Sequence, residues 1–355
     1  MAKTRVIGLD IGTTMVRAAE LEFGSGAPTR RGPATLVRYG EAPLPIGAVR
    51  DGEVVEQPLV ALAIRGLWAS QKFASKNVVI GVGNQRVVVR ELAVPAMPMA
   101  QVRATLPFQV QELLPMSTDE ALLDFYPVEQ VDGENGSVLQ GLLVAAVRDT
   151  VSANVLAVES AGLLPTMVDL NALALLRAMV RGTLGRQTVA LVDVGARVTD
   201  VVIASHGVPR FIRTVPMGGQ DVTDAIARAM GISLPEADAL KRHLGVGFGV
   251  PDDHADAAAA VEAVARSLVE AIRNTFVYYS GNNPGQHIEA AVLTGGGAHL
   301  PGFGQYLATA TRLEVKLGDP LETVTVARSA GGRESFVGHE SLMALPLGLA
   351  YGVAA

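Results

Sequence analysis

The chain has 355 residues, of which 49% are hydrophobic and 18% charged, a balance typical of a globular protein and not of a disordered one. This length is enough to bury one or two sizeable cores. A net charge of −6 without a basic tract argues against a nucleic-acid partner. The absence of cysteine excludes a disulfide scaffold, a thiolate metal site and a cysteine nucleophile.

Neither a signal peptide nor a membrane span is predicted. The chain reaches Asp10 without the long apolar core of a signal peptide. The longest uncharged run, residues 290–311, is broken by glycines and a proline and predicts a strand followed by a loop. We therefore expect a soluble protein whose contact with a membrane goes through a partner.

Strands dominate the first part of the chain. Residues 6–21 predict a strand, a glycine turn and a second strand, and a helix is expected over about Pro58–Ser70. Between them, Gly24–Pro33 is rich in glycine, serine, proline and arginine and predicts a mobile loop. The β-branched runs Val78–Ile80 and Val87–Val89 predict a hairpin.

A small inserted α+β unit is predicted from about Val94 onward. Its strand-like pieces are Ala121–Pro127 and Ser137–Val147, separated by the turn Asp132–Gly136. Before them, an apolar stripe at helical spacing either lines a groove for a partner peptide or forms the core of the inserted unit itself. The stripe comprises Val102, Leu106, Val110, Leu113 and Leu114.

The rest of the chain alternates between helices and strands. Residues 189–207 repeat the strand, glycine turn and strand of residues 6–21, which indicates an internal pseudo-repeat with large insertions. Gly245–Asp256 is expected to be exposed. The other expected elements are helices over Thr150–Ala161, Ala172–Val180, a segment starting near Asp221, a segment capped by Ser233 and Glu236, and Val261–Phe276, and strands over Leu164–Leu170 and Ala290–Leu293.

The two turns of the pseudo-repeat carry the chemistry. In Asp10–Thr14 and in Asp193–Thr199, an acid ends a buried strand and glycine follows two positions later. Glycine lets the backbone approach an anion, and successive N–H groups form an anion-binding concavity. The acid is suited to hold Mg²⁺, directly or through water. Two such turns facing each other would grip the phosphate tail of one nucleotide.

A glycine triplet in Thr294–Ala298 is the third motif. Three glycines after a strand let the backbone lie flat against a planar group or a phosphate, although such a triplet alone is also typical of a flexible loop. In this order, the three motifs resemble those of the actin-like ATPase superfamily, which includes actin, heat-shock-70 chaperones and sugar kinases. The resemblance implies an α/β fold of two domains, with a nucleotide in the cleft between them.

Longer stretches narrow the resemblance. ELAVPAMPMAQV, QELLP, LLDFYPV, LLVAAVRD, AGLLPTMVDLNALALLRA and VEAIRNTFVYYSGNNPGQHIEAAVLTGGGAHLPGF occur in that order and together resemble the PilM family, the cytoplasmic actin-like proteins of type IV pilus assembly. This resemblance covers nearly the whole chain. It implies a small subdomain shared with the division protein FtsA, ATP or ADP with Mg²⁺ in the cleft, and docking of the N-terminal cytoplasmic peptide of the membrane protein PilN onto the first domain beside that subdomain.

The resemblance also divides the chain and assigns roles. We expect a first domain at 1–84, 166–186 and 345–355, an inserted FtsA/PilM-type subdomain at 85–165, a second-domain core at 187–219 and 286–344, and an outer subdomain at 220–285. The Mg²⁺-associated acids are Asp10 and Asp193. The positions that bind nucleotide are Asp10, Gly12, Thr13, Thr14, Asp193, Gly195, Thr199, Gly219, Asp238, Lys241, Gly295, Gly296 and Gly297. For Asp238 and Lys241, an ordinary ion pair on a solvated helix face is the alternative.

Slow turnover at most is expected, because hydrolysis needs a group that positions or activates water opposite the γ-phosphate. Asp169 and Asn171 are the nearest candidates by motif position, and Asn171 is a weak substitute for a base. The expected function is that of an ATP-binding assembly protein at the inner-membrane platform of a type IV pilus, peripheral to the membrane, with other platform proteins and self-association left open as contacts.

Two alternatives are weighed against this function. An FtsA-like filament protein of cell division would be expected to carry an amphipathic membrane helix with a basic face. The final residues LPLGLAYGVAA offer no such face. A small-molecule kinase or phosphatase of the same superfamily needs a base beside a substrate hydroxyl and usually a larger substrate-binding insertion, and neither is visible. Fold alone does not decide among these functions.

Overall fold

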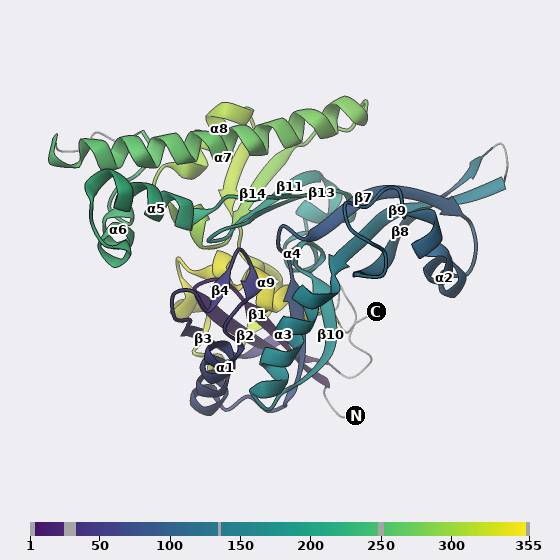
Figure 1. Cartoon of the computed structure of the whole chain (residues 1–355), viewed down its shortest axis with the longest axis horizontal. Helices are drawn as coiled ribbons and strands as arrows, with labels where there is room; N and C mark the ends of the chain where they lie inside the picture. Colours follow the sequence, from purple (N-terminus) through teal and green to yellow (C-terminus); the bar gives the residue numbers. More distant parts are fainter. Residues whose placement is uncertain (1–3, 25–32, 134–135, 248–251, 353–355) are drawn as a thin grey trace.

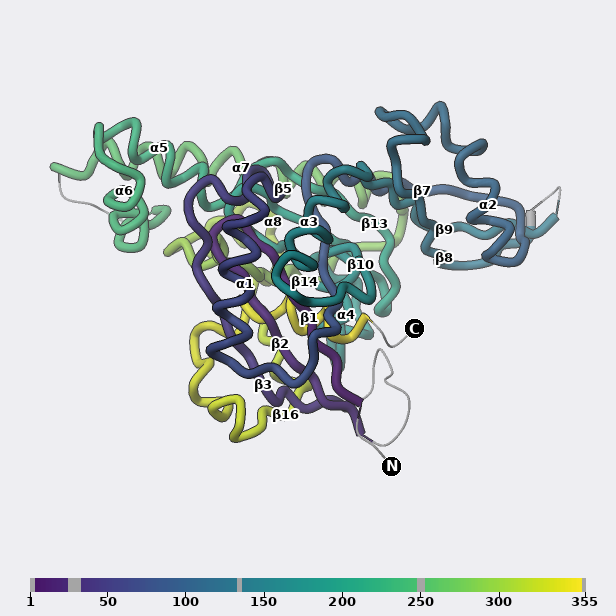
Figure 2. Tube along the Cα trace, turned by 60° about the horizontal axis from the view of Figure 1, so that its bottom comes forward, coloured from purple at the N-terminus to yellow at the C-terminus, as the bar shows by residue number. Residues whose placement is uncertain are grey.

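The computed structural model describes residues 4–24, 33–133, 136–247 and 252–352. Most of the predicted loop Gly24–Pro33 and part of Gly245–Asp256 lie outside the described residues. Two large sheets lie one above the other in Figure 1, and a third, smaller sheet extends to one side. Figure 2 separates the same three parts in a second view.

The first sheet has six strands in the order β10-β6-β1-β2-β3-β16. The first hairpin is antiparallel and continues into β3, whereas β6 and β10 run parallel to β1. The strands are β1 (Thr4–Ile11), β2 (Met15–Phe23), β3 (Ala34–Pro43), β6 (Asn77–Val82), β10 (Leu164–Leu170) and β16 (Val324–Val326). Because β1, β6 and β10 are parallel, their carboxyl ends meet at one edge of the sheet.

Helices cover both faces of the first sheet. α1 (Gln57–Gln71) and α3 (Arg148–Ser160) pack on one face, beside the short pair β4 (Val49–Arg50) and β5 (Glu53–Val54). α4 (Asn171–Met179) and α9 (Ala344–Ala350) pack on the other face. α9 approaches α4 closely at Gly348, because a Cβ added to Gly348 would overlap the carbonyl of Ala174 on α4.

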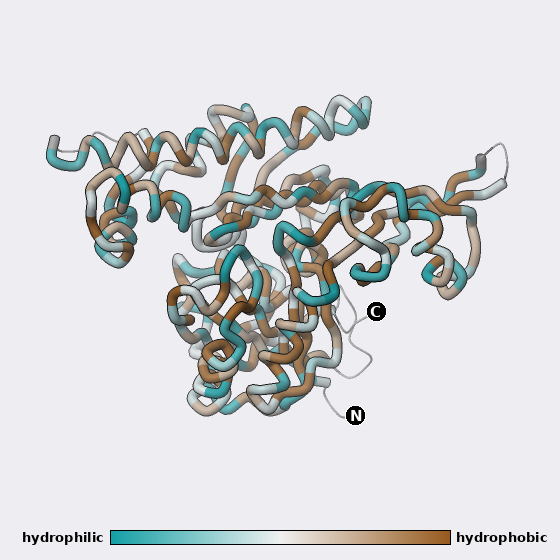
Figure 3. Tube along the Cα trace, in the orientation of Figure 1, coloured by the Kyte–Doolittle hydropathy of each residue, from teal (hydrophilic) through white to brown (hydrophobic). Residues whose placement is uncertain are grey.

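The second sheet repeats the strand order of the first, as the pseudo-repeat predicts. Its order is β13-β12-β11-β14-β15, with three antiparallel strands followed by two parallel ones. The elements are β11 (Thr188–Val194), β12 (Thr199–Ser205), β13 (Val208–Val215), β14 (Ala290–Thr294), β15 (Glu314–Leu317), α5 (Gly219–Met230), α6 (Leu234–Lys241), α7 (Ala255–Asn282) and α8 (Phe303–Thr311). Figure 3 shows hydrophobic and hydrophilic residues alternating along α7, whose apolar face packs on this sheet.

The third sheet corrects one prediction and decides between two alternatives for another. It consists of β7 (Val87–Pro95), β9 (Gly136–Val147) and β8 (Ala121–Gly133), with α2 (Met99–Gln109) packed on it. The predicted hairpin between Val78–Ile80 and Val87–Val89 is therefore wrong, because these runs belong to two different sheets. The apolar stripe lines no groove at Val102, Leu106 and Val110, which are fully buried in the core of this small unit.

Two segments pack away from the unit to which the sequence assigns them. α3 lies on the first sheet against α1, although residues up to 165 were expected in the inserted subdomain. β16 pairs with β3 in the first sheet, although 286–344 was expected in the second domain. Short 3₁₀ turns complete the described chain at η1 (Leu184–Arg186), η2 (Asp252–His254), η3 (Gly296–His299), η4 (Pro320–Thr323), η5 (Arg328–Ala330), η6 (Arg333–Phe336) and η7 (Glu340–Met343). In the part of the chain that the structure describes, no helix combines the length and apolarity that crossing a bilayer requires.

Candidate functional site

The two predicted turns have the same construction. In the first, Gly12 N donates to Met15 O at 3.0 Å, and in the second, Gly195 N donates to Val198 O at 2.9 Å. Each turn directly follows the strand that carries its acid, so Asp10 and Asp193 end β1 and β11 in equivalent positions.

The two acids are both buried, and the charge of Asp193 acts on Asp10. Asp10 is 8% exposed, and burial raises its pKa to about 6, with the charge of Asp193 contributing in the same direction. Burial also raises the pKa of Asp193. The structure therefore brings together the ends of β1 and β11, which belong to different sheets, as the facing of the two turns requires.

Arg17 is a site residue that the sequence reasoning missed. It lies opposite Asp10 across the first hairpin, with Nη1 4.0 Å from Asp10 Oδ2, and its Nε donates to Glu41 Oε2 at 3.2 Å. Its charge lowers the pKa of both Asp10 and Asp193, against the larger effect of burial. The signal lay in the register, because a residue opposite the acid on the returning strand points to the same face.

The second hairpin carries an acid where the first carries Arg17. Asp200 lies opposite Asp193, and burial raises its pKa to about 6, while Thr214 Oγ1 donates to Asp200 Oδ1 at 2.7 Å. The pseudo-repeat is thus symmetric in backbone and asymmetric in charge, with the cation on the side of the first sheet.

The glycine triplet lies against the second turn. Thr294 Oγ1 donates to Asp193 Oδ1 at 2.7 Å. Gly295 has a φ of +82°, and a Cβ there would lie 2.5 Å from Val194 O and 3.0 Å from Asp193 Oδ1. Gly297 is equally constrained by Val194, whereas an added Cβ on Gly296 would meet nothing within 4 Å. Two of the three glycines are therefore required by close backbone approach.

The start of α5 packs against the second turn and the glycine triplet. Gly219 N donates to Gly195 O at 2.9 Å, and a Cβ on Gly219 would lie 3.3 Å from the Cα of Gly297. Arg197, in the second turn, pairs with Asp221 at 3.1 Å and with Asp224 at 2.6 Å. The second turn, the glycine triplet and the beginning of α5 thus form one continuous backbone surface.

Lys241 joins this surface from α6. Its Nζ donates to Gly219 O at 3.2 Å and to Thr223 Oγ1 at 2.8 Å, and lies 2.7 Å from Asp238 Oδ1. Asp238 also pairs with the exposed Arg242. The structure therefore brings Lys241 to the predicted site, while Asp238 serves partly as an ordinary ion-pair partner on the helix face.

The threonines of the two turns differ in whether their side chains are accessible to a ligand. Thr13 is half-buried, and Thr14 is exposed, with its carbonyl accepting from Leu44 N at 2.8 Å. Thr199 is fully buried, and its hydroxyl donates to Met217 O at 2.8 Å. The hydroxyl of Thr199 is committed to holding β12 against the end of β13, so its predicted contact with phosphate has no support in the structure.

The side chains of the two candidates for water activation, Asp169 and Asn171, are engaged in contacts within the first domain. The Asp169 carboxylate pairs with Arg177, which also donates from Nε to Gly348 O at 3.2 Å. The Asn171 side chain rests against the backbone at the end of β6, where a Cβ on Gly83 would lie 2.6 Å from its Nδ2. Arg177 thus connects Asp169 at the end of β10 with α4 and α9, which favours a structural role for Asp169.

Asp169→Ala is expected to lower the free energy of unfolding by about 3–5 kcal/mol, because it removes the carboxylate that neutralises the largely buried Arg177. Urea unfolding measures this change. The matched control is Asp124→Ala, which breaks an exposed ion pair with Arg103 and is expected to cost about 0–1 kcal/mol. A loss of ADP release per folded molecule without a loss of stability would instead return Asp169 to the catalytic role.

The negative charges of Asp10 and Asp193 suit the binding of a divalent cation. Burial raises the pKa of both carboxylates, and a cation that neutralises them would stabilise their charged forms. Within the described ranges, no group of three or more His, Cys, Asp or Glu side chains is arranged to hold a metal ion. Asp10 and Asp193 would therefore hold Mg²⁺ together with ligands from outside the protein, such as phosphate oxygens and water.

The raised pKa of Asp10 makes stability depend on pH. Because it lies near 6 in the folded protein and at 3.8 ordinarily, the folded chain binds the proton more tightly than the unfolded chain. The stability of the nucleotide-free protein should therefore fall as the pH rises from about 4 to about 6. Asp10→Asn should raise the free energy of unfolding at pH 7 by up to about 3 kcal/mol and flatten this dependence in thermal unfolding. An identical pH profile for both proteins would contradict the burial argument.

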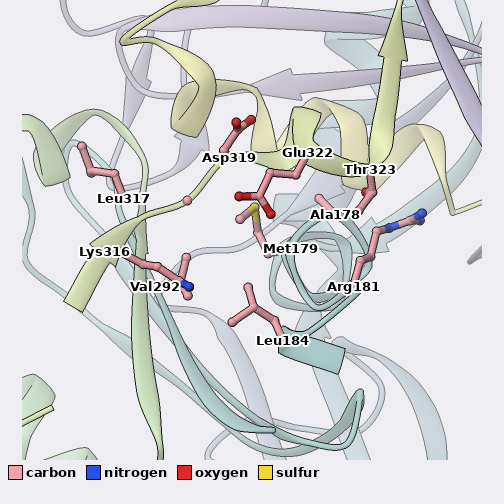
Figure 4. A pocket seen from close by; sticks show the side chains of 11 residues that line it. Ala178, Met179, Arg181, Leu184, Val292, Lys316, Leu317, Asp319, Glu322 and Thr323 are labelled. Atoms are coloured by element: carbon pink, nitrogen blue, oxygen red, sulfur yellow. The ribbon is translucent and has the colours of Figure 1, made fainter. Parts of the chain in front are cut away.

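A cavity of about 40 Å³ lies away from the turns, among the described residues. It lies between the end of α4, β14, β15 and η4, with Met179 and Val292 beside Lys316 and Glu322 (Figure 4). Such a volume holds only a few water molecules. This cavity is therefore too small for a nucleotide.

Known proteins share this architecture. The chain is similar over the full length of both chains to a protein of a solved "PilM-PilN type IV pilus biogenesis complex", with a TM-score of 0.84 and 24% sequence identity. It is also similar to MreB5 of Spiroplasma citri bound to AMPPNP, with a TM-score of 0.51, 14% identity and coverage of 91% of this chain and 94% of that one. The predicted actin-like α/β fold is confirmed.

Sequence comparison gives the family. Over 107 residues, or 30% of this chain, the sequence is 28% identical to the cell division protein FtsA of Bacillus subtilis (strain 168), and this match spans 24% of the length of that relative. The family described as "Type IV pilus assembly protein PilM" matches residues 8–352. Because that match covers nearly the whole sequence, the chain belongs to the PilM family of type IV pilus assembly proteins.

Proposed function

We propose that this protein is a nucleotide-binding adaptor of the type IV pilus machinery, and that it docks the N-terminal cytoplasmic tail of PilN. The observation that carries the nucleotide part is the convergence of two acid-bearing turns with the glycine triplet. The docking part is supported by the family and by the full-length similarity to a protein of a PilM–PilN complex. The FtsA-like alternative is not favoured, since that match covers only a local segment.

The residues present suggest how a nucleotide would be held. Backbone amides after Gly12 and Gly195 would receive the phosphates, and Arg17 would supply a positive charge between the two turns. Asp10 and Asp193 would hold Mg²⁺, which would neutralise the phosphate charge. Gly295–Gly297 would lie against the adenosine, with Lys241 and Asp238 beyond Gly219. With the Asp169 carboxylate paired to Arg177, ATP would serve mainly as a structural or switching ligand with slow turnover.

The docking surface would lie on the first sheet beside the third sheet. α3 starts where β8 starts, because Arg148 Nη2 donates to Ala121 O at 3.2 Å. Exposed apolar side chains occur on both elements, Leu122 at 37% and Leu156 at 48% exposure. A short apolar peptide would cover them. The protein would then reach the inner face of the membrane from the cytoplasm through PilN.

Calorimetry with a synthetic PilN tail peptide from the same genome tests the proposal, with Mg-ATP, with Mg-ADP and without nucleotide. We expect micromolar binding that Leu156→Asp weakens. The matched control is Leu62→Asp, which changes an exposed leucine on α1. Normal nucleotide binding without any peptide binding would contradict the adaptor function and leave a filament protein or an enzyme. Nucleotide affinity unchanged by Arg17→Gln would contradict the proposed phosphate site.

A further inference from the structure

The third sheet is attached to the first sheet by the chain itself. The chain leaves the end of β6 and enters β7 after four residues, 83–86, and it passes directly from Val147 on β9 into Arg148 on α3. The two crossings lie side by side, since Val147 N donates to Arg86 O at 3.4 Å. Short, paired crossings act as a hinge of limited range.

The third sheet also touches the second sheet, to which it has no covalent connection nearby. β7 and β8 contact β13, and Figures 1 and 2 both show β7 beside β13. One hydrophobic cluster includes Val87 and Leu142 from the third sheet together with Ala204 and Ile212 from the second. The small sheet therefore bridges the two halves that carry the two acid-bearing turns.

One ion pair joins these sheets. Arg210 Nη1 on β13 donates to Glu129 Oε1 on β8 at 2.7 Å. Both residues lie at irregularities of their strands. The register of β8 shifts between Pro127 and Glu129, and the pairing of β13 with β12 passes from Phe211 to Pro209 without including Arg210. Bulges redirect side chains, so each strand has a local distortion at the residue that reaches across.

Arg210 lies beside the packing of β13 on α7, and part of its guanidinium group is buried. Its Nε is buried and has no hydrogen-bond partner among the described residues. Phe211, the next residue, packs against Tyr278 and Tyr279 of α7. The pKa of Tyr279 is raised chiefly by burial, with Arg210 lowering it and Glu91 of β7 raising it, so charges from two sheets reach one helix.

We propose that the Glu129–Arg210 ion pair is a latch that couples closure of the nucleotide cleft to the position of the third sheet, and thereby to the affinity for the PilN tail. The inference rests on the proposed function. If a nucleotide draws the two acid-bearing turns together, the second sheet shifts relative to the first. The third sheet is joined covalently to the first sheet, and to the second sheet by apolar packing and the latch, so it must follow the second sheet or break these contacts. Its contacts then differ between the two states, which is what coupling requires.

The test compares peptide affinity with and without Mg-ATP in latch variants. Both side chains are partly exposed, at 44% for Glu129 and 26% for Arg210, so the variants should fold. We expect Mg-ATP to change the dissociation constant of the PilN peptide by about fivefold or more in the native protein. Glu129→Gln and Arg210→Gln should reduce this factor to below about twofold, and the exchange Glu129→Arg with Arg210→Glu should restore it.

Asp124→Asn is the matched control, because it removes an ion pair with Arg103 inside the same unit without crossing to the second sheet. It should keep the full coupling factor. An unchanged factor in both single variants would overturn the latch, as would a factor of one in the native protein with both ligands bound. Hydrogen exchange of the β8 amides gives a readout without peptide, since Mg-ATP should change their protection in the native protein and not in Arg210→Gln.

The outcomes also separate the latch from the proposed function. Failure of the peptide to bind, with normal nucleotide binding, overturns the adaptor function, and hydrogen exchange then decides the latch alone. Failure of the nucleotide to bind overturns both. Normal binding of both ligands without coupling overturns the latch and leaves the adaptor function standing.

Discussion

Gly295→Ala is expected to weaken nucleotide binding by about tenfold or more and to lower the free energy of unfolding by about 1–3 kcal/mol. Alanine is strained at a φ of +82°, and its Cβ would press on Val194 O and on the Asp193 carboxylate. The glycine triplet would have to move away from the second turn, taking with it the surface proposed for the adenosine. Calorimetry with Mg-ADP and urea unfolding measure the two effects.

The neighbouring Gly296→Ala is the matched control. Gly296 is exposed, and an added Cβ there meets nothing within 4 Å. It should leave the free energy of unfolding within about 0.5 kcal/mol and weaken nucleotide binding less than Gly295→Ala does. Equal losses in both variants would mean that the triplet acts through its general flexibility and not through the close approach at Gly295.

Gly348→Ala is expected to lower the free energy of unfolding by about 3 kcal/mol, at the upper end of overpacking effects. The added Cβ would overlap the carbonyl of Ala174, and backbone cannot yield as a flexible side chain does. α4 and α9 would have to separate where they cross beneath the first sheet, where α9 also packs against β1. Thermal or urea unfolding measures the loss.

Gly66→Ala makes the same chemical change with the opposite expected sign. Gly66 lies on the exposed face of α1, where an added Cβ meets nothing within 4 Å. Alanine is favoured over glycine in a helix interior, so the variant should be more stable by about 0.5–1 kcal/mol. Two glycine-to-alanine variants that shift stability in the same direction would contradict the packing account of Gly348.

The local elements followed from sequence patterns because their causes are local. The strand over Leu164–Leu170 begins and ends at the predicted residues, and the turn after Ser160 contains Gly162 with a φ of +82°. The capping pair of Ser233 and Glu236 forms as predicted, with Ser233 N donating to Glu236 Oε2 at 2.9 Å. Each of these depends on residues within a few positions of one another.

Predictions that needed a partner element were less reliable. The runs Val78–Ile80 and Val87–Val89 are strands, but sequence does not say which strand pairs with which, and the pairing divided them between two sheets. The stripe at Val102 and Leu106 is helical and apolar, but whether such a stripe faces a partner or its own core depends on what folds over it.

The candidate site also combines features that the sequence predicts with features that depend on the fold. The sequence by itself determined the two turns that follow Asp10 and Asp193 and the glycine triplet, because these carry their chemistry in consecutive residues. Only the tertiary structure decided that the charge of Arg17 acts on both acids, that Thr199 is committed to Met217, and that Asp169 is neutralised by Arg177. Consecutive residues fix backbone chemistry, whereas the charge, burial and partner of a side chain depend on what the fold brings against it from elsewhere in the chain.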